Sequence, residues 1–274
     1  MHPPHGSPPP KLSLPHIKNL IAVASGKGGV GKSTVATNLA LALAQAGHRV
    51  GLMDADIYGP SVPLMMGIRG TVDQHTTPLP LDRYGLRLMS IGFIVPPTQA
   101  VIWRGPMVDR ALRQFLTDLD WGPLDYLVID LPPGTGDAQL TLTQSAPLSG
   151  AVIVTTPQEV SLIDARKGLE MFRQVHVPVL GIVENMSYFV GDDGKRYEIF
   201  MHGGGKKLAG DAGVPFLGDI PLDPRVAQCG DTGDPIVHRF PDVPVAQAYA
   251  KLAQTVVGEL QKHKAPAPLP GLQM

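Results

Sequence analysis

One segment constrains the fold of this chain more than any other, the glycine-rich stretch GKGGVGKS at residues 26–33. It follows a short apolar run, residues 21–25, that has the length and composition of a buried strand. It leads into residues 32–45, whose pattern predicts a helix closed by Gly47. A glycine-rich turn between a strand and a helix, with this spacing of Gly, Gly, Lys and Ser, is typical of a phosphate-binding loop, or P-loop.

Each part of this loop has a physical task. Glycines let the backbone turn tightly and point its N–H groups at phosphate oxygens, and the N-terminus of the following helix adds partial positive charge. We expect Lys32 to reach the β- and γ-phosphates of a nucleotide, and the Ser33 hydroxyl to ligate Mg²⁺. The predicted nucleotide-binding residues of the loop are Gly26, Lys27, Gly28, Gly29, Val30, Gly31, Lys32, Ser33 and Thr34.

The rest of the chain alternates strand-like and helix-like segments. This predicts the α/β class, a three-layer P-loop NTPase fold with a mostly parallel central sheet and helices on both faces. Further strands are expected at residues 49–54, 86–91, 126–130, 151–155, 179–183 and 215–220. Further helices are expected at residues 107–119, from about residue 162 with Ser161 and Asp164 spaced as a capping box, and at residues 245–262.

The composition of the chain limits its possible domain organisation and the kinds of partner that it can bind. Residues 1–16 contain six prolines and three histidines, which predicts a flexible leader. One P-loop ATPase domain is expected over residues 17–262, followed by a Pro-rich tail at 263–274. Lys plus Arg (23) nearly cancel Asp plus Glu (24), which argues against binding to nucleic acid through bulk charge. No apolar run approaches the ~20 residues of a membrane span, so a cytoplasmic protein is expected.

Lys27 adds information, because an ordinary P-loop does not require a lysine directly after its first glycine. GKGGVGKS therefore resembles the deviant Walker A motif of the group that contains MinD, ParA, the nitrogenase iron protein and the Mrp/ApbC proteins. The resemblance implies ATP as the nucleotide and a homodimer in which Lys27 reaches the partner subunit's nucleotide as a catalytic residue. The alternative is an exposed lysine that touches only its own loop.

Asp54 and Asp130 end predicted strands and Asp56 follows one of them, at the edge where ligands gather in open α/β sheets. Asp130 ends the run YLVID, which resembles a Walker B strand, and is expected to hold Mg²⁺ directly or through water. Asp54 and Asp56 lie in DADIYGPS, which resembles the switch I segment of the group. By analogy, Asp54 lies near the water shell of Mg²⁺, and Asp56 orients the attacking water and is counted with Lys27 and Lys32 as catalytic. The division of roles between Asp54 and Asp56 stays open.

Two later segments complete the predicted site. Asn185, in VENMS, follows a strand, and in this group an asparagine there reads the edge of adenine, because its amide both donates and accepts. The segment PLDPR at residues 221–225 resembles the other wall of the base pocket, through Pro221 and Asp223. Ordinary turn formation is the alternative explanation for Asn185.

Several phrases narrow the resemblance to one branch, the Mrp/ApbC family of iron–sulfur cluster carrier ATPases, over roughly residues 17–260. They are GKGGVGKSTVATNLALALA, DADIYGPS, RGPMVDRALRQFL from Arg104, DYLVIDLPPGTGDAQLT and VENMSYF. Typical members carry a C-x-x-C pair shortly after ENMSYF, with which two subunits hold a [4Fe–4S] cluster. Here that segment, residues 190–205, has no cysteine, and its residues 191–200 predict a β-hairpin around a Gly-containing turn.

The missing pair leaves Cys229, the one cysteine of the chain, as a weak candidate for a cluster ligand. Asp192, Asp193 and His202 are poor replacements for thiolates. The leading hypothesis is a homodimeric, slowly hydrolysing ATPase that acts in iron–sulfur cluster assembly or in transfer to apo-proteins, with an assembly scaffold as a further partner.

The alternatives are a MinD- or ParA-like positioning ATPase that binds membrane or DNA, and a small-molecule ligase or kinase of the same fold. MinD-like anchoring needs a C-terminal amphipathic helix with a basic polar face. The last predicted helix has an apolar stripe, but its opposite face is sparsely basic. Docking of this helix on the core is therefore the expectation. The stripe consists of Tyr249, Leu252, Val256 and Leu260.

Overall fold

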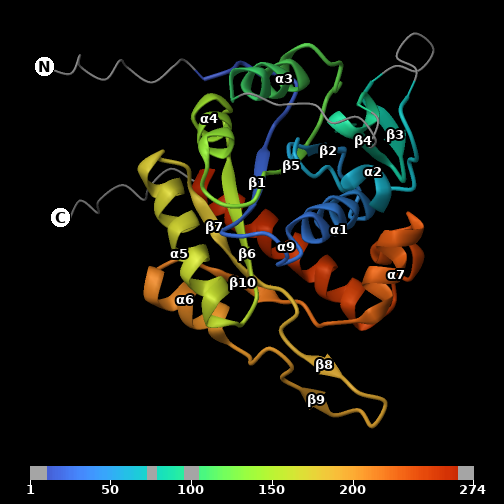
Figure 1. Ribbon diagram of the computed structural model, residues 1–274, viewed down its shortest axis with the longest axis vertical. Helices are drawn as coiled ribbons and strands as arrows, with labels where there is room; N and C mark the ends of the chain where they lie inside the picture. The colour runs from blue at the N-terminus through green and yellow to red at the C-terminus, as the bar shows by residue number, and fades with distance from the viewer. Residues whose placement is uncertain (1–10, 73–78, 96–104, 265–274) are drawn as a thin grey trace, which may run out of the picture.

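The computed structural model describes residues 11–72, 79–95 and 105–264 (Figure 1). The first ten residues of the predicted leader, Arg104 of the RGPM phrase and the tail from residue 265 lie outside the described residues. Residues 11–16 of the predicted leader lie against the domain, because the Leu12 N–H donates to the carbonyl of Ser145.

An eight-stranded sheet forms the centre of the molecule, in the order β10-β7-β6-β1-β5-β2-β4-β3. All neighbouring strands are parallel except β3 and β4. The strands are β1 (Leu20–Ser25), β2 (Val50–Asp54), β3 (Leu81–Arg83), β4 (Leu86–Ser90), β5 (Tyr126–Asp130), β6 (Gly150–Thr155), β7 (Val179–Glu184) and β10 (Phe216–Asp219). The predicted fold class is confirmed.

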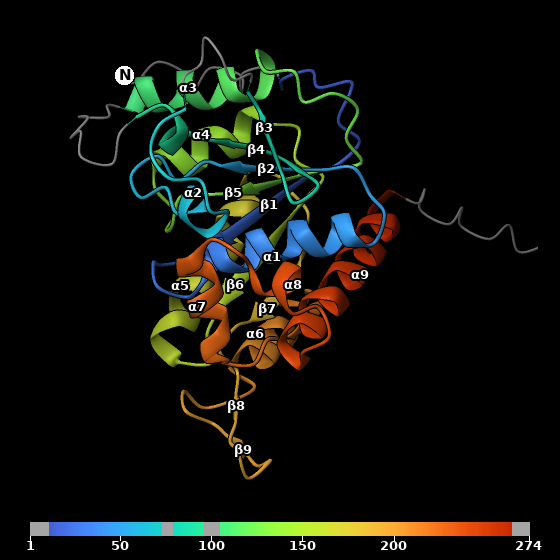
Figure 2. The same cartoon turned by 90° about the vertical axis from the view of Figure 1, so that its right-hand side faces the viewer.

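Helices cover both faces of this sheet. One face carries α1 (Lys32–Gln45) and α9 (Pro244–Lys264), which pack on each other, and Figure 2 turns these two helices toward the viewer. Near them lie α2 (Val62–Met65), α7 (Pro224–Thr232) and α8 (Ile236–Arg239). The other face carries α3 (Gly105–Thr117), α4 (Asp137–Ser145), α5 (Glu159–Gln174) and α6 (Gly204–Ala212). A short 3₁₀ helix, Ile91–Phe93, follows β4.

The central strands are buried along their whole length because helices cover both of their faces. The runs LIAVAS, YLVID and GAVIVT consist entirely of buried residues, as expected for a parallel sheet in the middle layer. The stripe on α9 is also buried, with each of its four side chains at most 2% exposed. The last helix therefore docks on the core, as its pattern predicted.

The start of α5 differs from the expectation. The helix begins at Glu159, because the N–H groups of Ser161 and Leu162 both donate to the carbonyl of Gln158. Ser161 lies inside the helix, where its hydroxyl accepts a hydrogen bond from Thr156 at 2.7 Å. The predicted capping box of Ser161 and Asp164 was therefore wrong. The helices α4, α6 and α7 were not anticipated, because short polar and glycine-containing segments carry little periodic signal.

Candidate nucleotide-binding site

The P-loop lies at the carboxyl ends of the parallel strands, between β1 and α1. Gly31 has a positive φ of 82°, and an added Cβ at this position would lie 2.2 Å from Nδ2 of Asn185. An added Cβ at Gly26 would lie 2.1 Å from the backbone of Asp164 on α5. Both glycines are thus required by close approach of other elements, which fixes the loop between α5 and the end of β7.

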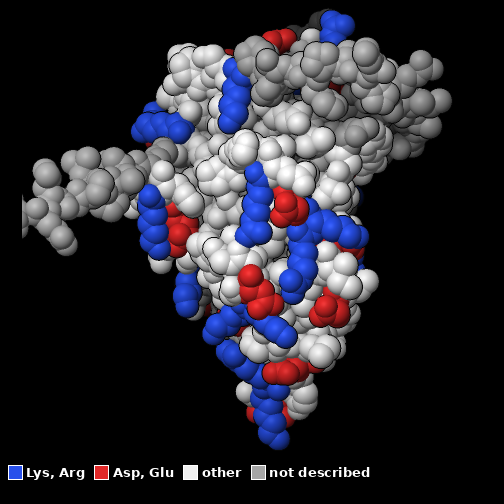
Figure 3. All heavy atoms as spheres, turned by 90° about the vertical axis from the view of Figure 1, so that its left-hand side faces the viewer, with Lys and Arg blue, Asp and Glu red and all other residues white. Residues whose placement is uncertain are grey.

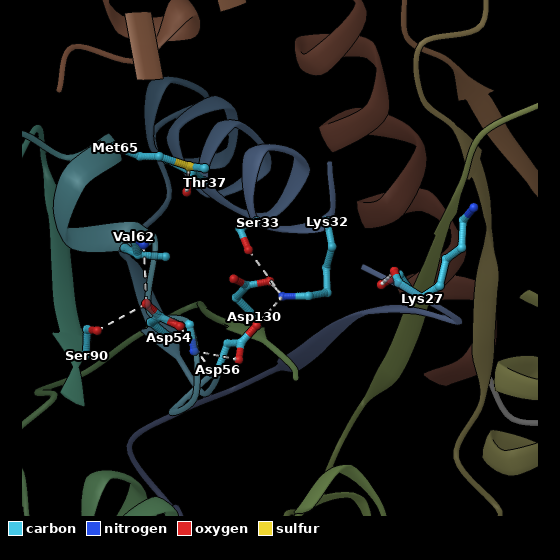
Figure 4. Close-up of polar contacts among 12 residues, drawn as sticks. Lys27, Lys32, Ser33, Thr37, Asp54, Asp56, Val62, Met65, Ser90 and Asp130 are labelled. Atoms are coloured by element: carbon cyan, nitrogen blue, oxygen red, sulfur yellow. Dashed lines mark hydrogen bonds and ion pairs between the residues drawn. The ribbon is translucent and has the colours of Figure 1, made fainter. Parts of the chain in front are cut away.

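Lys32 lies at the centre of a buried cluster of charges (Figure 4). Its side chain is 6% exposed, and its Nζ lies 2.5 Å from Oδ1 of Asp130 and 3.9 Å from Oδ2 of Asp56. The Ser33 hydroxyl is 3.2 Å from the same Nζ. The sheet explains this meeting of residues distant in sequence, because β1 and β2 each pair with β5 and bring their carboxyl ends together.

Asp54, the third aspartate of the cluster, is fully buried, and its carboxylate accepts hydrogen bonds from other groups of the protein. Its carboxylate accepts hydrogen bonds from the N–H groups of Asp56 and Val62 and from the Ser90 hydroxyl, at 3.1, 3.3 and 3.0 Å. Burial, together with the neighbouring charge of Asp130, raises the pKa of Asp54 to about 8. These bonds leave Asp54 better placed to act through water than as a direct metal ligand, and they fix the start of α2.

The other two aspartates, Asp56 and Asp130, have carboxylate oxygens that are more available for binding a metal ion or water. Burial raises the pKa of Asp130, an effect that the ammonium of Lys32 opposes. Burial also raises the pKa of Asp56, and Lys32 again opposes it. Within the described ranges, Oδ2 of Asp130 is buried without a hydrogen-bond partner. A carboxylate oxygen without a partner, a serine hydroxyl and a nearby second carboxylate are hard oxygen donors, so Asp130, Ser33 and Asp54 fit Mg²⁺.

Lys27 behaves differently from Lys32. Figure 4 shows its side chain directed away from the cluster formed by Lys32 and Asp130. In the part of the chain that the structure describes, its ammonium makes no ion pair, and its carbonyl accepts a hydrogen bond from the Ser25 hydroxyl at 2.8 Å. Whether Lys27 acts on the nucleotide of a partner subunit stays a prediction.

A pocket of about 310 Å³ adjoins the P-loop. Asn185 lies at its edge, 5% exposed, and its Nδ2 donates to the carbonyl of Val30 at 2.9 Å. The pocket brings together predicted residues from three segments and adds side chains of α2, α7 and α9. Its lining comprises Gly31, Thr34, Ser61, Leu64, Met65, Asn185, Met186, Pro221, Leu222, Asp223, Val226, Ala227, Gly230, Asp231 and Tyr249.

The sequence predicted the wall of this pocket that contains Asn185 and Pro221, but not the walls formed by α2 and α7. The walls from α2 and α7 carry no motif, and only the packing of these helices on each other reveals them. Asp223 lines the pocket, but its carboxylate caps α7 by accepting from the Arg225 N–H and pairs with the Arg225 guanidinium at 2.6 Å. That pairing lowers the pKa of Asp223. Its side chain is therefore committed to the helix start.

Comparison with known protein families identifies the family of this chain. A family model described as the NUBPL iron-transfer P-loop NTPase of the ParA group matches residues 16–257. The chain belongs to that family. It is 53% identical over 260 residues to the iron–sulfur cluster carrier protein of Synechocystis sp., covering 92% of this chain and 74% of the relative. It is 49% identical over 258 residues to the iron–sulfur cluster transfer protein NUBPL of Mus musculus, covering 92% and 81%.

Solved structures agree with this assignment. A nucleotide-binding protein of Archaeoglobus fulgidus, described in complex with ADP and with cobalt, is 42% identical with a TM-score of 0.68 and covers 80% of this chain and 88% of its own. The cell division ATPase MinD of Pyrococcus furiosus, at 22% identity and a TM-score of 0.66 over 88% and 99% of the two chains, shows the shared fold alone. The family predicted from the sequence is confirmed.

In this NUBPL-type NTPase the predicted hairpin is present, as β8 (Phe189–Val190) and β9 (Arg196–Tyr197). Its base is fixed by Glu184, which is fully buried and accepts hydrogen bonds from the Ser187 hydroxyl and from the N–H groups of Gly203 and Gly205. Ser187 Oγ is also 2.7 Å from Nδ1 of His202. These contacts hold the hairpin against the N-terminus of α6.

Cys229 lies on α7, within the hydrophobic core at 1% exposure. Burial raises the pKa of its thiol, which disfavours the thiolate that iron requires. The described residues contain no group of three or more His, Cys, Asp or Glu side chains arranged to hold a metal ion. As placed, Cys229 does not support the predicted role as a cluster ligand.

The surface and the helices bear on membrane and nucleic-acid binding. On the face shown in Figure 3, Lys and Arg side chains lie interspersed with Asp and Glu side chains down to the hairpin. Among the described helices, none combines the length and apolar character that crossing a bilayer requires. This face therefore carries charges of both signs.

Proposed function

We propose that this protein is a slow, homodimeric ATPase that uses Mg·ATP as a switch in iron–sulfur cluster assembly or in transfer to apo-proteins. The observation that carries the proposal is the buried cluster of Lys32, Asp130 and Asp56, which adjoins a base-sized pocket at the carboxyl edge of the sheet. The relatives named as iron–sulfur cluster carrier and transfer proteins support the choice of cargo.

The proposed chemistry follows from the positions of these side chains. Lys32 would exchange its contact with Asp130 for the β- and γ-phosphates, which frees both oxygens of that carboxylate. Ser33 and Asp130 would hold Mg²⁺, with Asp54 acting through water, and the bound ion would neutralise charge on the phosphate oxygens. Asp56 is partly open beside Lys32 and would orient the attacking water.

Lys27 completes the proposal as the residue that requires a second copy. Its ammonium points away from its own phosphate site, so in a homodimer it would reach the partner subunit's nucleotide and stabilise the charge that develops on transfer. Exposed apolar side chains on the helix that touches the P-loop, Val160 and Ile163, are 57% and 48% exposed. They offer apolar area for such an interface.

Asn185 and Pro221 would contact the base of the nucleotide in this proposal. With Nδ2 committed to the carbonyl of Val30, Oδ1 of Asn185 is the atom left to accept from the adenine amino group. The same contact ties the base pocket to the P-loop. Base and phosphates would thus be sensed by one connected piece of backbone.

The iron–sulfur cluster is the cargo in this proposal. Two copies of a chain with one cysteine offer two thiols at most, and Cys229 is buried. The proposal therefore assigns this protein nucleotide-dependent handling of partner proteins rather than tight storage of a [4Fe–4S] cluster. It includes the cytoplasmic location expected from the sequence, which cell fractionation tests.

The test is activation of an apo iron–sulfur acceptor by anaerobically reconstituted protein, with Mg·ATP, with Mg·ADP and without nucleotide. Iron and sulfide analysis of the wild type beside Cys229→Ser separates cargo binding from delivery. We expect ATP-dependent activation that Lys32→Ala abolishes and Cys229→Ser retains. No activation in any nucleotide state, together with ATP-dependent binding to liposomes or DNA, would instead support the positioning ATPase.

A further inference from the structure

Gln139 on α4 is buried without any hydrogen bond. Its side chain is 1% exposed, and neither Oε1 nor Nε2 has a partner. Among the described residues, Asn19 and Asp130 each have one such atom but use the other polar atom of the side chain. The free oxygen of Asp130 faces the proposed Mg²⁺ site, whereas that site does not account for Gln139. A buried amide without partners destabilises the state that contains it.

The surroundings of Gln139 make the burial unfavourable. Leu142 and Thr143 occupy the positions three and four residues later, and both are buried. They therefore share one face of the helix with Gln139. Thr143 uses its hydroxyl to donate to the carbonyl of Leu140 at 2.8 Å, so it offers Gln139 no spare donor. An apolar side chain would suit this face better.

The position of Gln139 in α4 indicates a hydrogen-bonding role for its amide at the start of the helix. Gly136 is the N-cap of α4 and has no side chain to cap the helix. Gln139 is the third helical residue, the position from which a glutamine side chain can reach back to the N–H of the N-cap residue. Within the described residues, that N–H of Gly136 has no hydrogen-bond partner. A donor and an acceptor that fit one motif are thus both unpaired.

The loop before α4 connects this helix to the nucleotide site. Residues 131–136 start directly after Asp130, and the N–H of Gly134 donates to the carbonyl of Ser25, the last residue of β1, at 2.9 Å. A change at the phosphates therefore has a short path of backbone to the first turn of α4. The same loop ends at Gly136, the residue that lacks a cap.

We propose that Gln139 is a positioning residue that leaves its buried site when Mg·ATP binds and accepts a hydrogen bond from the N–H of Gly136. This bond fixes the end of the 131–136 loop, the segment that joins Asp130 to α4. The inference rests on the proposed nucleotide site. In the nucleotide-free state the Gln139 amide is buried and does not bond to the Gly136 N–H. The hydrogen bond that fixes the loop end therefore forms only when the nucleotide is bound.

The experiment compares Gln139→Met, an apolar residue of similar size, with Gln144→Met, a matched change at an exposed position of the same helix. Without nucleotide, Gln139→Met should raise Tm by about 2–4 °C, because it removes the unpaired amide. The same variant should show a smaller Tm increase than the wild type on adding Mg·ATPγS, and kcat should fall by about threefold to tenfold. Gln144→Met should match the wild type in all three measurements.

A third variant, Gln139→Glu, separates positioning from packing. Glutamate accepts from the N-cap N–H as glutamine does, so it should retain most of the wild-type kcat. It should also lower the nucleotide-free Tm, because burying a carboxylate is more costly than burying an amide. A Met variant that is more stable but slower, beside a Glu variant that is less stable but retains most of its kcat, is not expected from a purely structural role.

Three results would overturn the inference. A fall in the nucleotide-free Tm of Gln139→Met would mean that ordered water satisfies the amide. An unchanged kcat and nucleotide response in that variant would mean that the amide has no role in the cycle. If the wild type and Gln144→Met do not bind Mg·ATP at all, the proposed function fails and this inference falls with it. Binding by both, with no effect at Gln139, would remove this inference alone.

Discussion

The phosphate end of the site and the hairpin are built in opposite ways. Around Lys32, charged side chains are buried and joined by contacts between β1, β2 and β5. In the hairpin, each strand has two residues, and Ile199 and Met201 just beyond it are 56% and 69% exposed. The first region tolerates little change because each group has a fixed partner. The second has a fixed base and a free outer surface, so its sequence is able to diverge.

This contrast explains how a member of the family retains a complete P-loop while the hairpin has no thiol pair. The hairpin's base is set by Glu184 and by the Leu222 N–H, which donates to the carbonyl of Tyr188 at 2.7 Å. None of these base contacts involves the outer residues of the hairpin. The absence of cysteines from the outer part is therefore compatible with an intact nucleotide site.

The largest expected effect tests the buried end. Lys32→Ala should weaken Mg·ATP binding by at least about 100-fold, because it removes the cation from the phosphates and leaves Asp130 buried without its ion pair. Isothermal titration calorimetry measures the change, with Gln144→Met as the control. Binding within a few-fold of the wild type would contradict the assignment of this cluster as the phosphate site.

The next effect separates the two lysines. Lys27→Ala should leave Mg·ATP affinity nearly unchanged and reduce kcat by about 100-fold, because Lys27 acts on the partner subunit's nucleotide in the proposed homodimer. Mixing this variant with Lys32→Ala should restore part of the turnover, since a mixed dimer contains one site with both lysines. No recovery in the mixture, with dimers present by light scattering, would argue against action between subunits.

A smaller effect concerns pH. The folded-state pKa of Asp54 is raised from 3.8 to about 8, so the folded protein retains a proton that the unfolded chain releases. The contribution of Asp54 to stability is full below about pH 4 and is lost as the pH rises through about 8. Urea unfolding of the nucleotide-free protein should show stability falling between pH 5 and pH 8, by at most about 1.4 kcal/mol per pH unit. Asp54→Asn should flatten the slope, and an equal slope in that variant would contradict the assignment.

The smallest effects belong to the outer hairpin. Met201→Ser should change the free energy of unfolding by no more than about 0.5 kcal/mol and leave Mg·ATP binding unchanged, because the side chain is mostly exposed. Delivery to an apo acceptor should nevertheless fall if this surface contacts partners. A large loss of stability or of ATP binding would show that the two regions are more tightly coupled than their contacts indicate.

The sequence was sufficient for the buried end because motif spacing there reflects hard constraints. The bounds of α1 and β5 match the predicted ranges, and Asn185 lies against Gly31 as a neighbour of the P-loop. The walls of the base pocket from α2 and α7 could not be predicted, since they depend on which helices pack together across the chain. The commitment of Asp223 to Arg225 was likewise hidden, because a cap and a ligand look alike in a sequence.

The ion pair between Lys32 and Asp130 has a consequence for the release of ADP and phosphate. When ADP and phosphate depart, the lysine does not remain as an isolated buried cation, because the aspartate 2.5 Å away neutralises it at once. At the phosphate site, the protein without nucleotide therefore holds Lys32 in an ion pair rather than as an unpaired buried charge. In the proposed cycle, release of ADP and phosphate would therefore need no replacement ligand for Lys32, which would let a slow switch reset by itself between rounds of delivery.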